Sequence, residues 1–118
     1  MSRRTDSQLL DDIRKAARRA MTYVSGMSYE SFIEDTKTQD AVIRNLEIIG
    51  EASKKLSQSA RAKYPGVPWK QMARSRDRLI HDYFGVNIDI VWHIAHEELP
   101  KVLRILDPNS GTQENGGV

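Results

Sequence analysis

Cysteine is absent from this 118-residue sequence, which excludes disulfide bonds, thiol nucleophiles and thiolate metal sites. No apolar run approaches the roughly 20 residues that a membrane-spanning helix requires. The first residues, Met1 to Arg4, lead into a polar stretch that lacks the apolar core of a signal peptide. We therefore expect a cytoplasmic protein without a membrane partner.

The sequence also lacks internal repeats, strand-like alternation and a large excess of one charge. Its 18 Lys and Arg residues against 16 Asp and Glu residues give a net charge of +2, which by itself does not indicate nucleic acid. Cations do gather near the N-terminus, at Arg3, Arg4, Arg14, Lys15, Arg18 and Arg19. They form either a solvated helix face or a surface that attracts phosphates.

Apolar residues recur every three or four positions along most of the chain, which predicts an all-α fold. Helices are expected over residues 6–25, 29–34 and 88–106, and a long central helix is expected to begin near Thr36. The predicted buried faces are Leu9, Ile13, Ala16, Ala17, Ala20 and Val24 in the first helix, Val42, Leu46, Ile49, Ala52 and Leu56 in the central helix, and Val91, Ile94, Ala95, Glu98 or Leu99, Val102 and Ile105 in the last.

Capping and helix-breaking residues mark the expected helix ends. Thr5 with Gln8, and Thr36 with Gln39, have the spacing of capping boxes. Pro100 should kink or break the last helix, because proline has no N–H to donate and its ring clashes with the preceding turn.

The chain length fits one domain. We place a helical domain at residues 1–106 and a disordered tail, rich in Gly, Asn and Ser, at residues 107–118. The predicted fold is a bundle of four main helices with a short extra helix.

The most informative stretch lies near the end of a further expected helix, which starts at Pro68 and stops at Gly85. Its buried stripe is expected to comprise Trp69, Met72, Ala73, Leu79 and Ile80. Arg76 occupies the position that this stripe leaves empty, and an unpaired buried guanidinium is costly. Arg76 should therefore reach an acidic partner, for which Glu51 is a candidate, or face an anion that arrives from outside.

The residues after Arg76 suggest a chemistry. In a continuous helix Asp77 and His81 would share a face, so the carboxylate could orient the imidazole, and Arg76 and Tyr83 would share another. Arg76 and His81 would diverge, but a two-fold dimer could bring two such pairs into one cleft. Histidine moves protons and arginine holds phosphate, which fits metal-free RNA cleavage. An internal ion pair and a helix-terminal histidine are the alternative that these residues leave open.

A metal site and a cofactor are not expected. His93 and His96 are three residues apart, a spacing that can bind a metal on a helix face, but no third ligand is evident and a surface or packing role is favoured. Trp69 and Trp92 are expected to anchor the core or an interface. Gly50, inside the central helix, predicts close helix packing.

The pattern Arg76-x4-His81-x-Tyr83, followed by Phe-Gly-Val, resembles the signature of HEPN-domain toxins of the HepT type. Three further segments fit that family: residues 45–52 (Asn-Leu-Glu-Ile-Ile-Gly-Glu-Ala), 68–69 (Pro-Trp) and 89–92 (Asp-Ile-Val-Trp). The resemblance covers roughly residues 6 to 106.

The resemblance implies a HEPN-like homodimer that acts as a metal-independent endoribonuclease. Arg76 and His81 would be the catalytic residues, and Asp77 fits the polar position that follows the arginine. Glu51, from its position on the central helix, could support the site by aiming Arg76. The same family implies that Tyr83 is the residue that a partner protein modifies.

That partner would be an MNT-type nucleotidyltransferase, the antitoxin of a type VII toxin–antitoxin system. It would transfer AMP from ATP to Tyr83 and so silence the ribonuclease. Two alternatives remain open: a non-catalytic helical module that binds a nucleotidyltransferase, and a plain dimeric interaction domain. The two genes could also have reversed roles.

Overall fold

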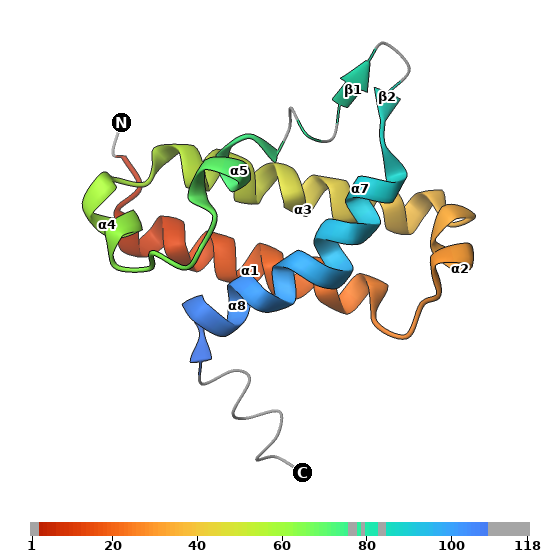
Figure 1. Ribbon diagram of the computed structural model, residues 1–118, viewed down its shortest axis with the longest axis horizontal. Coiled ribbons are helices and arrows are strands. Elements are labelled where there is room, and N and C mark those ends of the chain that lie inside the picture. The colour runs from red at the N-terminus through yellow and green to blue at the C-terminus, as the bar shows by residue number, and fades with distance from the viewer. Residues whose placement is uncertain (1–2, 76–77, 79, 83–84, 109–118) are drawn as a thin grey trace.

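The computed structural model describes residues 3–75, 78, 80–82 and 85–108, and these form the predicted all-α architecture (Figure 1). Two long helices, α1 (Asp6–Val24) and α3 (Thr36–Lys55), lie antiparallel and make the most extensive contact in the molecule. The remaining elements are α2 (Tyr29–Ile33), α4 (Gln58–Ala62), α5 (Trp69–Ala73), β1 (Ile80–Asp82), β2 (Gly85–Val86), α7 (Ile88–His93), the π-helical segment η1 (Ile94–Glu98) and α8 (Leu99–Leu106). No helix in the described part of the chain is long and apolar enough to cross a membrane.

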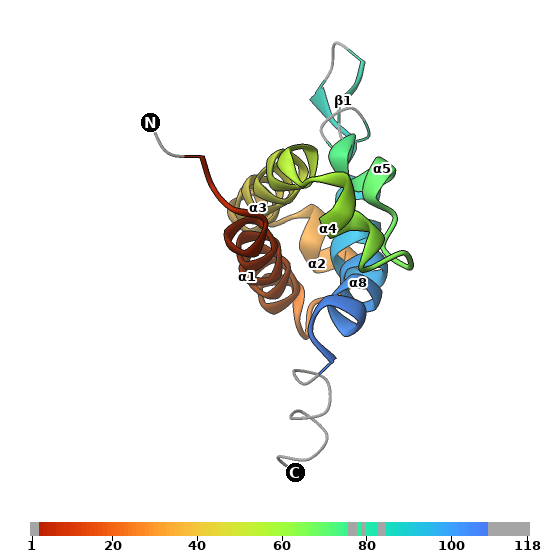
Figure 2. The same ribbon diagram turned by 90° about the vertical axis from the view of Figure 1, so that its left-hand side faces the viewer.

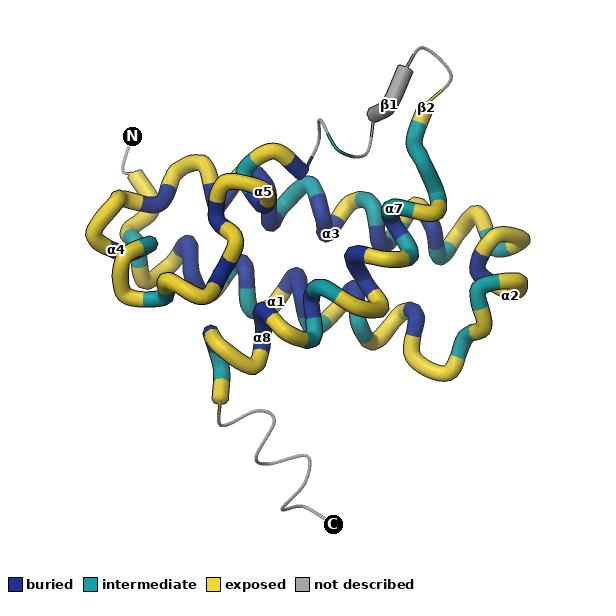
Figure 3. The backbone as a smooth tube through the Cα atoms, viewed as in Figure 1, coloured by how far each residue is buried: buried dark blue, intermediate teal, exposed yellow. Residues whose placement is uncertain are grey.

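The core lies between α1, α3 and the C-terminal helical stretch of α7, η1 and α8 (Figures 2 and 3). Every residue predicted for the buried faces of α1 and α3 is buried, so both predictions are confirmed. The fully buried Phe32 of α2 packs its ring 5.2 Å from the ring of Trp92 on α7. The Tyr29 hydroxyl donates a hydrogen bond to the Asp89 carboxylate, which raises the pKa of Tyr29 and ties α2 to α7 again.

The two predicted capping boxes have different outcomes. At α1, the Gln8 N–H donates to the Thr5 hydroxyl at 3.1 Å and the Thr5 N–H donates to the Gln8 side chain at 2.9 Å, as predicted. At α3 the prediction is wrong, because Asp35 is the N-cap and its carboxylate accepts the Thr38 N–H at 3.0 Å. Helix α3 therefore begins at Thr36 itself.

The expected helix from Pro68 to Gly85 is also wrong. Helix α5 ends at Ala73, Ser75 and Arg78 are again helical, and Ile80–Asp82 pairs with Gly85–Val86 as two short antiparallel strands. Both views show these strands standing away from the helical body (Figures 1 and 2). The β-branched Ile80 suits a strand, and Gly85 adopts a φ of +106° that favours glycine.

The last helical stretch covers the expected residues but contains an irregularity before Pro100. In η1 the Leu99 N–H donates to the Ile94 carbonyl, five residues back, so one extra residue enters the turn. The buried stripe consequently shifts by one position. Leu103 and Leu106 are 7% and 3% exposed, whereas Ile105, predicted to face inward, is 36% exposed.

Candidate functional site

Five residues were predicted to form the site, and Glu51 is the one whose side chain the structure describes. It is exposed on α3. Arg76, Asp77 and Tyr83 lie outside the described residues, and for His81 only the backbone is described, in strand β1. Their catalytic, supporting and modification roles stay predictions.

The position of His81 in β1 changes one step of the reasoning. A shared helix face for Asp77 and His81 required a helix that continued through residue 81, and that helix is replaced by the strand Ile80–Asp82. The shared face of Arg76 and Tyr83 required the same helix. The homodimer stays a prediction, although the helix that two copies would pack together does not continue through residue 81.

A cleft of about 200 Å³ opens between α3 and α5. Its lining comprises Arg44, Glu47, Gly50, Glu51, Lys54 and Ala73. The two helices approach closely here, because a Cβ on Gly50 would lie 3.4 Å from the Met72 carbonyl oxygen and from the Ser75 Cβ. The predicted close packing at Gly50 is thereby confirmed.

The cleft lies beside the start of the Arg76–Tyr83 segment. Ala73, in its wall, precedes Arg76 by three residues, so their Cα atoms are at most about 11 Å apart. Ser75, immediately before Arg76, is buried, and its hydroxyl donates to the Met72 carbonyl at 2.5 Å. Glu51 therefore lines the same cleft as Ala73, the residue three positions before the start of the motif at Arg76.

Two cations, Arg44 and Lys54, belong to the described lining of this cleft, and Lys70 and Arg74 lie in or next to α5. Arg44 and Lys54 on α3, and Lys70 and Arg74 at α5, are exposed and contact no described carboxylate. Among the described lining residues, Glu47 and Glu51 balance the charges of Arg44 and Lys54, and Arg74 follows the lining residue Ala73 directly.

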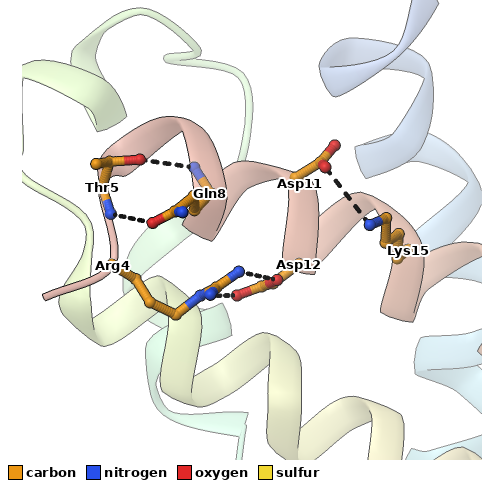
Figure 4. Close-up of polar contacts among 6 residues, drawn as sticks. All are labelled: Arg4, Thr5, Gln8, Asp11, Asp12 and Lys15. Atoms are coloured by element: carbon orange, nitrogen blue, oxygen red, sulfur yellow. Dashed lines mark hydrogen bonds and ion pairs between the residues drawn. The ribbon is translucent and has the colours of Figure 1, made fainter. Parts of the chain in front are cut away.

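The cations near the N-terminus are mostly engaged within the protein. Arg4 binds both carboxylate oxygens of Asp12 at 2.7 Å, and Lys15 lies 3.6 Å from Asp11 (Figure 4). Arg18 pairs with Asp107. The Arg14 Nε–H donates to the Leu106 carbonyl at 2.9 Å. These partners favour a solvated, internally paired face over a phosphate-binding surface.

Arg78, inside the motif, forms an ion pair that the sequence did not predict. Its guanidinium donates two hydrogen bonds to the Glu98 carboxylate, at 3.0 and 2.8 Å, and the pairing lowers the pKa of Glu98. His93 Nε2 lies 3.3 Å from the same carboxylate. The sequence carried no signal for this contact, since a helical repeat without the π segment placed Glu98 at the core boundary.

The two histidines of the last stretch have packing and pairing roles. His96 stacks on Trp92 with ring centroids 4.7 Å apart, and its Nδ1 lies 2.6 Å from Glu97. No group of three or more possible ligands that could hold a metal occurs within residues 3–75, 78, 80–82 and 85–108.

Comparison with known proteins defines the class of this helical protein. The sequence profile of the HepT-like family, described as Ribonuclease HepT-like, matches residues 13–108. The chain therefore belongs to the HepT-like family.

Individual relatives agree with this assignment. The candidate RNase MJ0127 of Methanocaldococcus jannaschii is 44% identical over 110 residues, which cover 90% of this chain and 91% of the relative. The Probable ribonuclease HepT of Thermococcus cleftensis is 42% identical over 100 residues, 85% of this chain and 91% of the relative. No solved structure matches this chain.

Proposed function

We propose that this protein is a metal-independent endoribonuclease whose catalytic residues are Arg76 and His81. The observation that carries the proposal is membership of the HepT-like family over residues 13–108, combined with the Arg76-x4-His81-x-Tyr83 pattern inside that range. The names of the relatives, RNase and ribonuclease, support the same activity.

The proposed reaction is an internal transesterification of RNA. The ribose 2′-oxygen attacks the adjacent phosphorus, a new P–O bond forms, and the bond to the 5′-oxygen of the next nucleotide breaks. His81 takes or gives the proton at these oxygens, and Arg76 stabilises the charge on the phosphorane. Asp77 and Glu51 support the catalytic pair. In favour of this role for Glu51, it lines the same cleft as Ala73, three residues before Arg76.

We further propose that RNA approaches along the cleft between α3 and α5. Arg44 and Lys54 line this cleft, and Arg74 follows the lining residue Ala73. All three are exposed and have no described carboxylate partner. A cation that is already paired gains less from a phosphate, because binding must first break the existing pair. The paired cations of α1 are for that reason a poorer surface for RNA.

The biological role that we propose is that of the toxin in a type VII toxin–antitoxin system, acting as a homodimer in the cytoplasm. An MNT-type nucleotidyltransferase would silence it. In that step the Tyr83 oxygen attacks the α-phosphorus of ATP, AMP is bonded to Tyr83, and pyrophosphate leaves. The family resemblance supports this step, since the shared helix face of Arg76 and Tyr83 no longer does.

The test is cleavage of single-stranded RNA by the purified protein in the presence of EDTA. We expect products ending in a 2′,3′-cyclic phosphate, with the rate falling about 10²- to 10⁴-fold in His81→Ala and in Arg76→Ala. His96→Gln is the matched control, because this exposed histidine stacks on Trp92 and pairs with Glu97. A His81→Ala variant that cleaves RNA at the wild-type rate would overturn the catalytic assignment.

An inert wild-type protein would favour the alternative function, a helical module that binds a nucleotidyltransferase. Such a module would form its complex equally well with and without His81. Mass spectrometry after co-expression with the nucleotidyltransferase tests the regulatory step separately, and an unmodified Tyr83 would refute it.

A further inference from the structure

We propose that Arg78 and Glu98 form a clamp that fixes Arg78, two residues after Arg76 and three before His81, to the C-terminal helical stretch. Glu98 is thereby a positioning residue for RNA cleavage. The inference rests on the proposed ribonuclease function for its consequence in catalysis. The clamp itself rests on contacts between described residues.

The geometry of the pair is that of a directional clamp. Two guanidinium nitrogens of Arg78 bond the two carboxylate oxygens of Glu98 at 3.0 and 2.8 Å. The side chains are 28% and 25% exposed, so water reaches them only in part. A bidentate arginine–carboxylate pair fixes orientation as well as distance, which a lysine or a single hydrogen bond does not.

Glu98 is the last residue of the π-helical segment η1. Without the extra residue of that segment, the helical repeat would carry position 98 toward the core. With it, Leu99 enters the core at 2% exposure and Glu98 stays at the edge. Ala95, on the same segment, is 1% exposed. The Glu98 carboxylate thus lies on a turn whose residues Ala95 and Leu99 are buried in the core. π turns often occur at functional sites.

Arg78 lies between the two proposed catalytic residues in the sequence. It follows Arg76 by two residues and precedes His81 by three, so its Cα is at most about 7 Å and about 11 Å from theirs. The segment is anchored before Arg76 by the buried Ser75. It is anchored after His81 by Val86, which packs against the core. The ion pair with Glu98 attaches Arg78 to η1 between these two anchors.

Arg78 is a positioning residue rather than a second phosphate ligand. Both of its terminal nitrogens already bond Glu98, and releasing them for a phosphate would leave that carboxylate without its main partner. Arg44, Lys54 and Arg74 form no ion pair with a described residue. The motif therefore contains one arginine for chemistry, Arg76, and one for architecture, Arg78.

The test compares Glu98→Gln with Glu97→Gln. Glu97 is the adjacent carboxylate, is exposed and pairs with His96, so the control removes the same charge from the same turn. Amide hydrogen exchange over residues 76–86 should speed up in Glu98→Gln and stay at the wild-type rate in Glu97→Gln. The kcat for RNA cleavage should fall about tenfold to a hundredfold in Glu98→Gln, whereas RNA affinity, measured in a His81→Ala background, should change less than about twofold.

A charge-reversed pair supplies the rescue. Arg78→Glu and Glu98→Arg should each slow cleavage, and the double variant should recover part of the lost kcat. Arg78→Lys keeps the charge but loses the bidentate geometry, so it should stay impaired even if a charge-reversed variant fails to fold.

The two proposals fail in distinguishable ways. If the wild-type protein cleaves no RNA, the proposed function falls, while hydrogen exchange still tests the clamp. Equal exchange over residues 76–86 in wild type and Glu98→Gln would overturn the clamp. Wild-type kcat in a folded Glu98→Gln variant would overturn the positioning role.

Discussion

Removing the unpaired cations beside the α3–α5 cleft should weaken the salt dependence of RNA binding. The variant replaces Arg44, Lys54 and Arg74 with Gln, which removes three exposed charges without a described carboxylate partner. Each phosphate that a cation neutralises on a single strand contributes about 0.7 to the slope of log K against log salt. Three such contacts contribute about 2 to the slope. When salt is raised from about 50 to about 200 mM, the affinity of the wild type should therefore fall by a factor roughly 20 times larger than that of the variant.

The matched control replaces Arg4, Lys15 and Arg18 on the α1 side with Gln. It changes the net charge by the same amount, but these cations are paired with Asp12, Asp11 and Asp107. We expect the wild-type slope from it. Both variants carry His81→Ala so that cleavage does not disturb the measurement, and binding is followed by fluorescence anisotropy of a labelled single-stranded RNA at several salt concentrations.

The comparison separates local contact from overall charge. If both triple variants lose slope equally, net charge rather than the cleft determines binding. If the α1 variant alone loses slope, the cleft is the wrong surface and the N-terminal cations bind RNA despite their partners.

Three further predictions concern stability and can be measured by thermal or urea unfolding monitored by circular dichroism. Gly50→Ala should stabilise the protein by up to about 1 kcal/mol, because a Cβ there meets its neighbours at 3.4 Å, an ordinary contact, and alanine favours the helix; a loss of stability would contradict this. Asp35→Ala should cost about 1 kcal/mol and Thr36→Ala much less, because Asp35 caps α3; the reverse order would restore the Thr36 cap. Pairing with Arg78 lowers the pKa of Glu98 in the folded protein. The ion pair therefore stabilises the folded state at pH values above the pKa that Glu98 has in the unfolded chain. The stability gap between wild type and Glu98→Gln should therefore be full at neutral pH and should close as pH falls below about 4; a gap that persists at low pH would show that the ion pair does not cause it.

The long helices could be predicted from the sequence because their burial pattern is local. On α1 and α3 all the residues that the apolar spacing predicted to be buried are buried, and Thr5 with Gln8 marked the start of α1. The same reasoning misplaced the cap of α3, since Asp35 and Thr36 are both good caps and only the backbone conformation selects between them.

Two features depended on more than local spacing. The π segment shifted the buried stripe of the last helix by one residue, which exchanged Ile105 for Leu103 and Leu106. Periodicity assumes a constant 3.6-residue turn, so one inserted residue is invisible to it until the chain is packed. The strand at Ile80–Asp82 replaced an expected helix for a related reason, because the pairing partner at Gly85–Val86 competes with the helical turn.

The sequence by itself determined the all-α class, the two long helices, and the Arg76-x4-His81-x-Tyr83 pattern that places the chain in the HepT-like family. These are statements about residue order and short-range spacing, which the chain carries whether folded or not. Tertiary structure alone decided which cations are paired, where the α3–α5 cleft opens, and that Glu98 meets Arg78. The Arg78–Glu98 pair joins residues 20 positions apart, and the cleft brings α3 residues beside Ala73 of α5, so only the packing of η1 and α5 brings these residues together.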